Sequence, residues 1–414
     1  MSKLLSCKNK SAHFLLICLC YVSVEISAAS FNWDKENKLQ IHGFVSQSFI
    51  YTDKNNFLGD SSENGSLDFT ELALNFSYRA SDKLYVAGQL LSRRAGELDN
   101  GHLAVDFALL DYRFKDGVDY QFGVRAGRLK NALGFYNKTR DVPFTRPSII
   151  LPQSIYFDRT RDLAISSDGF QLYGHKNLSS GLLMLEFGLI MPVMSGKNTE
   201  LAILSVDRPG SLSGELGSLA RLVFNTNDQS LKISLTDLFL NAAYNESGIV
   251  DNGKFQFRQT ILSVSINKGK WDYSSEYARR EISFDGMPVN YVPPFLSHAT
   301  GESYYFQTVY HANSFWSAYL RYDVLYQNKK DRSGEQYLID FDLFAGVSTN
   351  KLVYSRFAKD KTLGLQWDVS HALMWRLELH LVDGIAWLPQ QNNPNIGEAD
   401  KRWKIIAASV SYKF

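Results

Sequence analysis

The last ten residues of the chain, Ile405 to Phe414, alternate in character with a period of two. One side carries the aromatic and aliphatic side chains Phe414, Tyr412, Val410, Ala408 and Ile406, and the other carries Lys413, Ser411, Ser409 and Ala407. A β-strand has this period when one face meets an apolar medium and the other a polar one. Because a terminal strand with a free edge is a liability in a soluble protein, the pattern favours a strand that closes a barrel. The closing strand of a soluble β-sandwich is the alternative.

This ending resembles the terminal signal of bacterial outer-membrane β-barrels, in which a final Phe follows alternating aromatic and apolar residues. The resemblance assigns Phe414 and Tyr412 to the assembly signal. It implies the barrel assembly machinery as a partner, and the outer membrane of a Gram-negative bacterium as the location.

The first 29 residues predict a secretory signal peptide. A basic start is followed by an apolar run, Phe14 to Val24, and by the small residues 27–29. The run is too short for a helix that spans a membrane. We therefore expect residues 1–29 to be removed, leaving 30–414 as one barrel domain. All three cysteines, Cys7, Cys18 and Cys20, lie in the signal, so the mature chain offers no disulfide and no cysteine ligand for a metal.

Charge and hydropathy narrow the class further. Without the signal the chain has 41 basic and 42 acidic residues, and such a balance argues against a nucleic-acid partner. No later apolar run reaches the length of a spanning helix. A closed barrel remains compatible with a mildly polar mean hydropathy, because only half of the residues of each strand face lipid.

Sixteen segments read as strands, and the links between them alternate between short and long. The segments are 39–52, 71–80, 83–93, 103–114, 120–128, 169–174, 182–194, 216–226, 231–244, 257–267, 271–282, 304–312, 315–327, 362–369, 373–382 and 403–414. The long links are 53–66, 94–102, 129–163, 195–215, 245–256, 283–303, 328–361 and 383–402. This alternation is typical of a meander between two compartments. The predicted fold is all-β: a single antiparallel transmembrane β-barrel of sixteen strands with an inward-folded third loop.

The clearest strand, Leu373 to Leu381, indicates the content of the barrel. Its odd-numbered residues are apolar, whereas Arg376, Glu378 and His380 share the other side. Because an Arg or Lys on the lipid face costs about 2–4 kcal/mol at mid-depth, the polar side should face the lumen. The lumen is therefore expected to be wet, and barrels of this strand number enclose an aqueous channel.

The long link 129–163 is the candidate for control of the channel. It is rich in aromatic and aliphatic residues, which need a surface to bury them, and its charges sum to +3. The predicted pore and selectivity residues are Arg125, Arg128, Lys130, Lys138, Arg140, Arg146, Arg159 and Arg161. Basic side chains around a pore attract anions. Two alternatives stay open: these side chains pair with Asp141, Asp158 and Asp162 and hold the loop, or some bind lipopolysaccharide phosphates outside.

The layout resembles the phosphate- and anion-selective porin superfamily of Gram-negative bacteria. In that superfamily a strand that ends in a Gly-Arg-Lys pattern leads into the constriction loop, as Gly123 to Lys130 does here. The resemblance implies a passive porin without cofactor or metal, and a homotrimer in contact with outer-membrane lipid and lipopolysaccharide.

The sequence thus predicts an outer-membrane channel for passive diffusion of small hydrophilic solutes, with anions as the favoured option. His-Glu-x-x-His and Gly-x-Ser-x-Gly motifs are absent from the sequence, and we expect no enzyme activity. The alternative is a barrel with a blocked lumen that acts as a surface-binding or scaffold protein.

Overall fold

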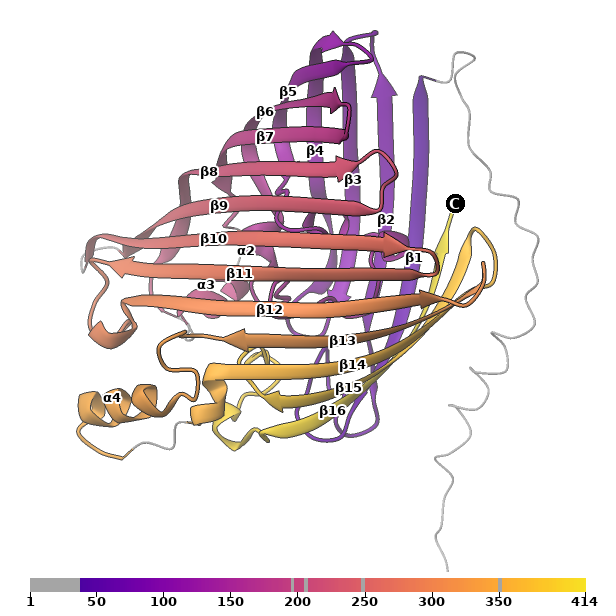
Figure 1. Cartoon of the computed structure of the whole chain (residues 1–414). Coiled ribbons are helices and arrows are strands. Elements are labelled where there is room, and N and C mark those ends of the chain that lie inside the picture. Colours follow the sequence, from indigo (N-terminus) through magenta and orange to yellow (C-terminus); the bar gives the residue numbers. More distant parts are fainter. Residues whose placement is uncertain (1–37, 195–196, 205–207, 247–249, 349–351) are drawn as a thin grey trace, which may run out of the picture.

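The computed structural model describes residues 38–194, 197–204, 208–246, 250–348 and 352–414. Within them, sixteen strands form one closed antiparallel barrel in which each strand pairs with its neighbours along the chain (Figure 1). The barrel closes where β1 (Leu39–Thr52) pairs with β16 (Arg402–Lys413). The predicted fold class is confirmed. The predicted signal peptide lies outside the described residues.

The remaining strands follow the predicted order, and their ends shift by up to seven residues. They are β2 (Ser66–Arg79), β3 (Leu84–Ala95), β4 (Asn100–Asp116), β5 (Tyr120–Lys130), β6 (Ser166–Leu178), β7 (Gly181–Pro192), β8 (Ser211–Thr226), β9 (Leu231–Glu246), β10 (Val250–Lys268), β11 (Trp271–Asp285), β12 (His298–His311), β13 (Trp316–Tyr326), β14 (Phe357–Asp368) and β15 (Leu373–Gly384).

Two of the predicted long links are short. The link between β3 and β4 is 96–99 rather than 94–102, and β10 begins at Val250 rather than at Phe257. The residues before Phe257 keep their pairing with β9, as in the register of Phe255 with Ala242. The polar residues near these strand ends favour a loop in the sequence, but the ladder of backbone hydrogen bonds continues through them.

Side chains alternate across the barrel wall as expected. On β15 the side chains of Leu377 and Leu379 are exposed on the outer surface, whereas Arg376, Glu378 and His380 are buried inside. Aromatic residues gather on the outer wall near the short turns, where the rings of Trp316 and Trp367 stack at a centroid distance of 5.4 Å. An apolar band bordered by aromatic rings is the outer surface that suits a lipid bilayer.

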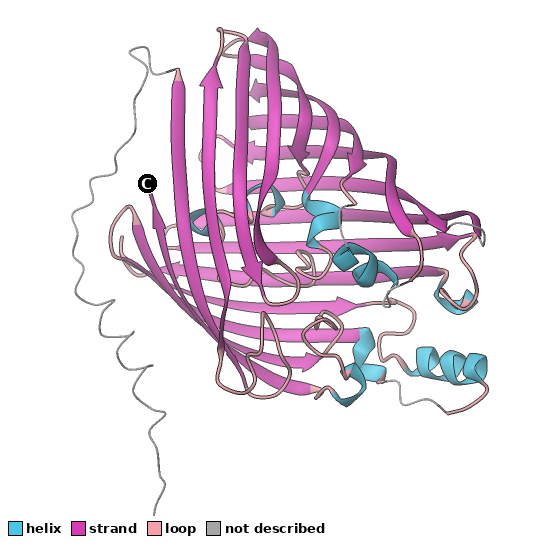
Figure 2. Ribbon diagram, turned by 180° about the vertical axis from the view of Figure 1, so that it is seen from behind, coloured by secondary structure: helices cyan, strands magenta, loops and turns pink. Residues whose placement is uncertain are grey.

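In the described part of the chain, three short α-helices lie in the links between strands (Figure 2). They are α2 (Arg161–Ile165), α3 (Lys197–Leu204) and α4 (Glu335–Ala345). The 3-10 turns are η1 (Asn137–Thr139), η2 (Pro143–Thr145), η3 (Pro294–Leu296), η4 (Val353–Arg356) and η5 (Ile396–Glu398). Leu163 of α2 and Leu204 of α3 join a buried cluster inside the barrel, while α4 projects beyond the strand ends (Figure 1). None of the helices in the described residues has the length and apolar character needed to cross a membrane.

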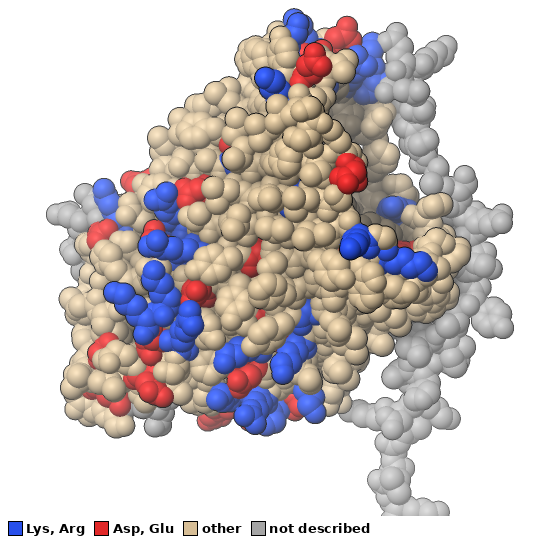
Figure 3. Space-filling view, in the orientation of Figure 1, with Lys and Arg blue, Asp and Glu red and all other residues tan. Residues whose placement is uncertain are grey.

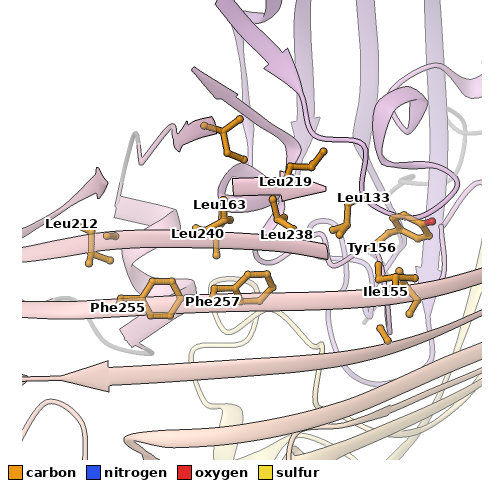
Figure 4. Packing of buried hydrophobic residues seen from close by; sticks show 14 of the residues in the cluster. Leu133, Ile155, Tyr156, Leu163, Leu212, Leu219, Leu238, Leu240, Phe255 and Phe257 are labelled. Atoms are coloured by element: carbon orange, nitrogen blue, oxygen red, sulfur yellow. The ribbon is translucent and has the colours of Figure 1, made fainter. Parts of the chain in front are cut away.

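Among the described residues, two large apolar clusters and a small third one around Phe44 occupy the inside of the barrel. In the first, inward residues of β8 to β11, such as Leu238 and Phe257, pack against Leu133 and Tyr156 of the link after β5 (Figure 4). In the second, Ile149 and Ile150 of the same link belong to a cluster with residues of the β15–β16 link and of β1, β13 and β16. The lumen is therefore not wet throughout, in contrast to the expectation. Aliphatic residues of an inserted loop need apolar partners on the wall, because their burial is favourable when it moves apolar surface from water into apolar surroundings.

The wall also contains a close contact between a ring and a glycine. Tyr319 of β13 lies opposite Gly364 of β14, and a Cβ atom added at Gly364 would overlap its ring. The Tyr319 hydroxyl donates to Glu378. Replacing Gly364 by Ala should therefore lower the stability of the barrel by about 1–3 kcal/mol, because the ring must leave its place.

The temperature at which the folded band converts to the unfolded band in gel electrophoresis measures this effect. Gly397→Ala is the control, since an added Cβ meets nothing within 4 Å there. An equal conversion temperature for the two variants would show that the Tyr319 ring can move without loss.

Candidate functional site

The link between β5 and β6 enters the barrel and is held there. This inserted loop, residues 131–165, is the predicted constriction loop with both ends shifted by two residues. Glu71 of β2 accepts two hydrogen bonds from Arg146. Three strands further round the wall, Glu378 of β15 accepts hydrogen bonds from the backbone N–H groups of Ile149 and Ile150. These contacts fix the loop to the part of the wall on either side of the β1–β16 seam.

Two further carboxylates of the wall bind the loop. Glu276 of β11 accepts from the Tyr156 hydroxyl at 2.5 Å and from the Phe135 N–H at 2.8 Å. Asp323 of β13 accepts from the Ser154 N–H at 3.2 Å. A carboxylate has enough lone pairs to accept several such hydrogen bonds. Hydrogen bonds to charged groups are stronger than those between neutral groups.

Arginines of the wall satisfy carbonyl groups of the same loop. Arg376 donates to the carbonyls of Pro143 at 2.9 Å and of Arg146 at 2.6 Å. Arg321 donates to the carbonyl of Ile150 at 3.0 Å. Buried backbone groups need such partners, because an unpaired one costs about 1–3 kcal/mol. The sequence indicates that the loop folds inward, but it does not indicate which wall residues bind the loop. The only sequence signal of these wall residues is their inward position on a strand.

Three of the predicted pore residues are buried in ion pairs. Arg140 pairs with Asp158 at 3.2 Å, Arg146 with Glu71, and Arg161 with Asp141 at 2.5 Å. Their side chains are only 5–7% exposed. This geometry matches the reading in which the cations hold the loop, rather than the one in which Arg140 and Arg146 face the narrowest part of the channel.

The pKa values of the loop groups agree with permanent ion pairing. Burial raises the pKa of Asp141, but Arg161 and Lys130 outweigh it and hold this pKa well below its ordinary range. Burial lowers the pKa of Arg140 to about 10 against the opposing effect of Asp158. Both groups are therefore charged near neutral pH.

Lys130, Arg159 and Arg128 have separate surroundings. Lys130 is bound between Asp106 and Asp141, each at 2.5 Å. Arg159 donates to the Ala202 carbonyl of α3 at 2.9 Å. Arg128 lies in register with Asp168 and pairs with it at 2.9 Å. Strand alternation places Asp168 on the outer face with Phe170, so Arg128 does not point into the lumen, in contrast to the expectation.

Five cations gather instead on the part of the inner wall that water reaches. This basic cluster consists of Arg113 of β4, Arg125 of β5, Lys138 of the inserted loop, Arg221 of β8 and Lys232 of β9. The side chains of Arg113, Arg125 and Lys138 are 25–31% exposed. Arg125 and Lys138 were predicted. Inward positions on adjacent strands could have identified the other three.

Carboxylates and aromatic rings orient the basic cluster. Arg125 pairs with Asp111 at 3.0 Å and stacks on the Tyr173 ring at 3.9 Å from its centroid. Lys138 and Arg221 both pair with Glu186, and Arg113 pairs with Asp116. Four of the five cations therefore contact three carboxylates, while Lys232 lies over the Phe135 ring. The five cations outnumber these carboxylates, which leaves a net positive charge on this part of the inner wall.

The predicted assembly residues form the seam of the barrel. Phe414 exchanges two backbone hydrogen bonds of 3.0 Å with Gly43, and Tyr412 lies in register with Val45. A Cβ atom added at Gly43 would overlap the Phe414 ring. No group of side chains suited to hold a metal ion occurs in the described ranges.

Comparison with known proteins supports the porin fold. An anion-selective porin from Comamonas acidovorans has a TM-score of 0.56 and 14% identity, covering 91% of this chain and 99% of that one. The outer-membrane channel DcaP of Acinetobacter baumannii has a TM-score of 0.55 and 13% identity, covering 91% and 97%. A trimer form of the outer-membrane protein OmpT of Vibrio cholerae has a TM-score of 0.53 and 9% identity, covering 91% and 99%. The chain resembles Gram-negative outer-membrane porins in fold.

Sequence comparison adds less. No protein-family model matches the chain. A segment of 125 residues is 30% identical to an uncharacterised protein of Aquifex aeolicus, and it covers 29% of this chain and 27% of that protein. The match therefore spans about a quarter of each protein.

Proposed function

We propose that the protein is an outer-membrane channel for passive diffusion of small hydrophilic solutes, with a preference for anions. The basic cluster is the observation that supports this proposal most directly, because its charges line the part of the lumen that water reaches. The porin fold of the solved neighbours, one of which is an anion-selective porin, agrees with it. Cations placed around a pore favour the entry of anions.

In this proposal the inserted loop sets the width of the channel and the basic cluster sets its charge. Buried ion pairs hold the loop together and bind it to β2, and hydrogen bonds to Glu276 bind it to β11, so that the width of the channel does not depend on flexible side chains. Solutes pass beside Arg125 and Lys138, which remain partly exposed. The passage of solutes needs no enzyme activity and no cofactor, because the solutes diffuse through a hydrated channel.

The second candidate is a barrel with a blocked lumen. The two apolar clusters and the buried ion pairs of the loop favour it, because they occupy much of the inside of the barrel. Single-channel recordings in planar lipid bilayers separate the two functions. Discrete current steps whose reversal potential in a salt gradient has the sign of anion transport support the channel, and an electrically silent, folded barrel supports the scaffold.

The remaining assignments belong to the same proposal. A signal peptide, residues 1–29, directs the chain to the outer membrane, and the barrel assembly machinery reads Phe414 and Tyr412. Lipopolysaccharide surrounds the outer wall. A homotrimer is proposed because one of the structural neighbours is described in a trimer form.

The topology of the proposal can be tested with single cysteines. Ser333 lies in the link between β13 and β14, and Ser180 lies in the short turn between β6 and β7. A membrane-impermeant maleimide added to intact cells should label Ser333→Cys and leave Ser180→Cys unlabelled, because long links face outside in such barrels. The unsubstituted protein serves as the blank. Labelling of the Ser180→Cys variant alone would invert the proposed orientation.

A further inference from the structure

A hollow on the outer wall is lined by cations. It spans β14 to β16 near their ends at the long links and has a volume of about 400 Å³. This basic hollow is lined by Lys359, Lys361, Arg402 and Lys404, with Tyr322, Asp53 and Asp383 beside them. Figure 3 shows Lys and Arg gathered toward the end of the wall from which α4 projects, while a band of the wall is almost free of charge.

The two acidic groups of the basic hollow do not neutralise it. Asp53 accepts a hydrogen bond from the backbone N–H of Lys404 at 2.7 Å. Asp383 reaches the cations Lys401 and Arg402 only at 3.8 and 3.9 Å. Among the described residues, neither Lys361 nor Lys404 has an ion pair with an acidic side chain. Cations grouped without counter-charges repel one another, so an anion at this place is favourable.

The basic hollow lies at the edge of the apolar band. Lys361, Leu381 and Lys404 are in register on three adjacent strands. Further along β14, the outward residues Leu363 and Leu365 are exposed, and Trp367 lies near the short turn. The six residue steps from Lys361 to Trp367 span about 20 Å of strand. The cations therefore lie at the level of one headgroup layer, where charged side chains cost little.

An apolar groove begins beside the basic hollow. Tyr322 lines both, and the groove continues over β13 to β10 with a volume of about 520 Å³. Its outward lining includes Leu320, Phe306, Tyr273 and Ile266. A ligand that extended through both would be anionic at one end and apolar along the other.

We propose that this surface binds one phosphate-bearing anionic lipid, with its headgroup in the basic hollow and an acyl chain in the apolar groove. The inference goes beyond the channel proposal and does not depend on it, since the cations lie on the outer wall. The shared residue Tyr322 fixes the relation between the two parts, because a headgroup at Lys361 and Lys404 places its acyl chains over the exposed residues of β13.

Lipid titration of the purified barrel in detergent micelles, followed by native mass spectrometry, tests this. The probes are dioleoyl phosphatidic acid, dioleoyl phosphatidylcholine and glycerol phosphate. The unsubstituted protein should bind phosphatidic acid, and the double variant Lys361→Gln/Lys404→Gln should bind it about thirtyfold more weakly, because each cation near an anionic lipid contributes about fivefold. The control Lys268→Gln/Lys270→Gln removes two cations at the β10–β11 turn and should bind as the unsubstituted protein does.

The other probes decide the chemistry. Equal affinity for phosphatidylcholine would overturn the charge recognition, and equal affinity for glycerol phosphate would overturn the role of the apolar groove. Equal loss in both double variants would overturn the assignment to β14–β16. Both variants should keep the channel conductance, so a failure of the lipid site is distinguishable from a failure of the channel proposal.

Discussion

Neutralising two cations of the basic cluster should abolish the preference for anions. In the double variant Arg125→Gln/Arg221→Gln, three cations face three carboxylates instead of five facing three. The Coulomb interaction energy between one unit charge and an ion about 8 Å away is about 2 kcal/mol at an effective dielectric constant of about 20. The ratio of anion to cation permeability should therefore fall by about tenfold or more, while Gln keeps the hydrogen-bonding capacity and much of the volume.

Reversal potentials in a potassium chloride gradient measure this ratio. The matched control is Arg258→Gln/Arg279→Gln, which removes two cations that pair with Asp237 and Glu281 on the outer wall. The control should keep the original reversal potential. If the two double variants behaved alike, the basic cluster would not line the path of the ions.

Removing two carboxylates that hold the inserted loop should widen the channel. In Glu71→Ala/Glu378→Ala, Arg146 loses its partner on β2 and two backbone N–H groups lose their acceptor on β15. Breaking one buried charged pair costs about 3–5 kcal/mol, and this variant also removes the acceptor of two backbone N–H groups, so the loop should leave the wall. A barrel of this strand number without a constriction encloses an open aqueous channel, so the single-channel conductance should rise severalfold.

A control separates loop release from damage to the barrel. Glu281→Ala removes a carboxylate of the outer wall that pairs with Arg279 and has no part in holding the loop. It should leave the conductance unchanged. Gel mobility before and after heating shows whether each variant is folded. A folded Glu71→Ala/Glu378→Ala barrel with unchanged conductance would mean that the apolar clusters alone retain the loop.

Much of the fold was predictable because every strand of the barrel wall alternates between residues that face outward and residues that face inward. The period of two located all sixteen strands, and it placed Glu378 and His380 inside without further information. The ends of strands were less predictable. Polar residues such as those before Phe257 continue a strand when its partner is long, and the length of the partner is not a local property.

The candidate site was predictable only in part, for a related reason. The composition of the loop indicated that it folds inward, and Arg125 and Lys138 do contribute to the basic cluster. Whether a loop cation faces water or a carboxylate depends on wall residues distant in sequence. Arg146 could not be paired with Glu71 from spacing alone, since 75 positions separate them. Arg128 shows that one step of strand register moves a side chain from one face to the other.

The positions of the loop partners along the chain have a consequence for the order of assembly. The inserted loop leaves the wall after β5, yet Phe135 binds Glu276, which lies 141 positions later, and Ile149 binds Glu378, which lies 229 positions later. Contacts between such distant segments form late, because the intervening chain must first be ordered. The loop therefore cannot reach its final place until β15 is in the wall, one strand before the seam. A precursor that stalls earlier would be an open sheet without the loop inside it. Protection of the loop from proteases would therefore report that the barrel is almost complete.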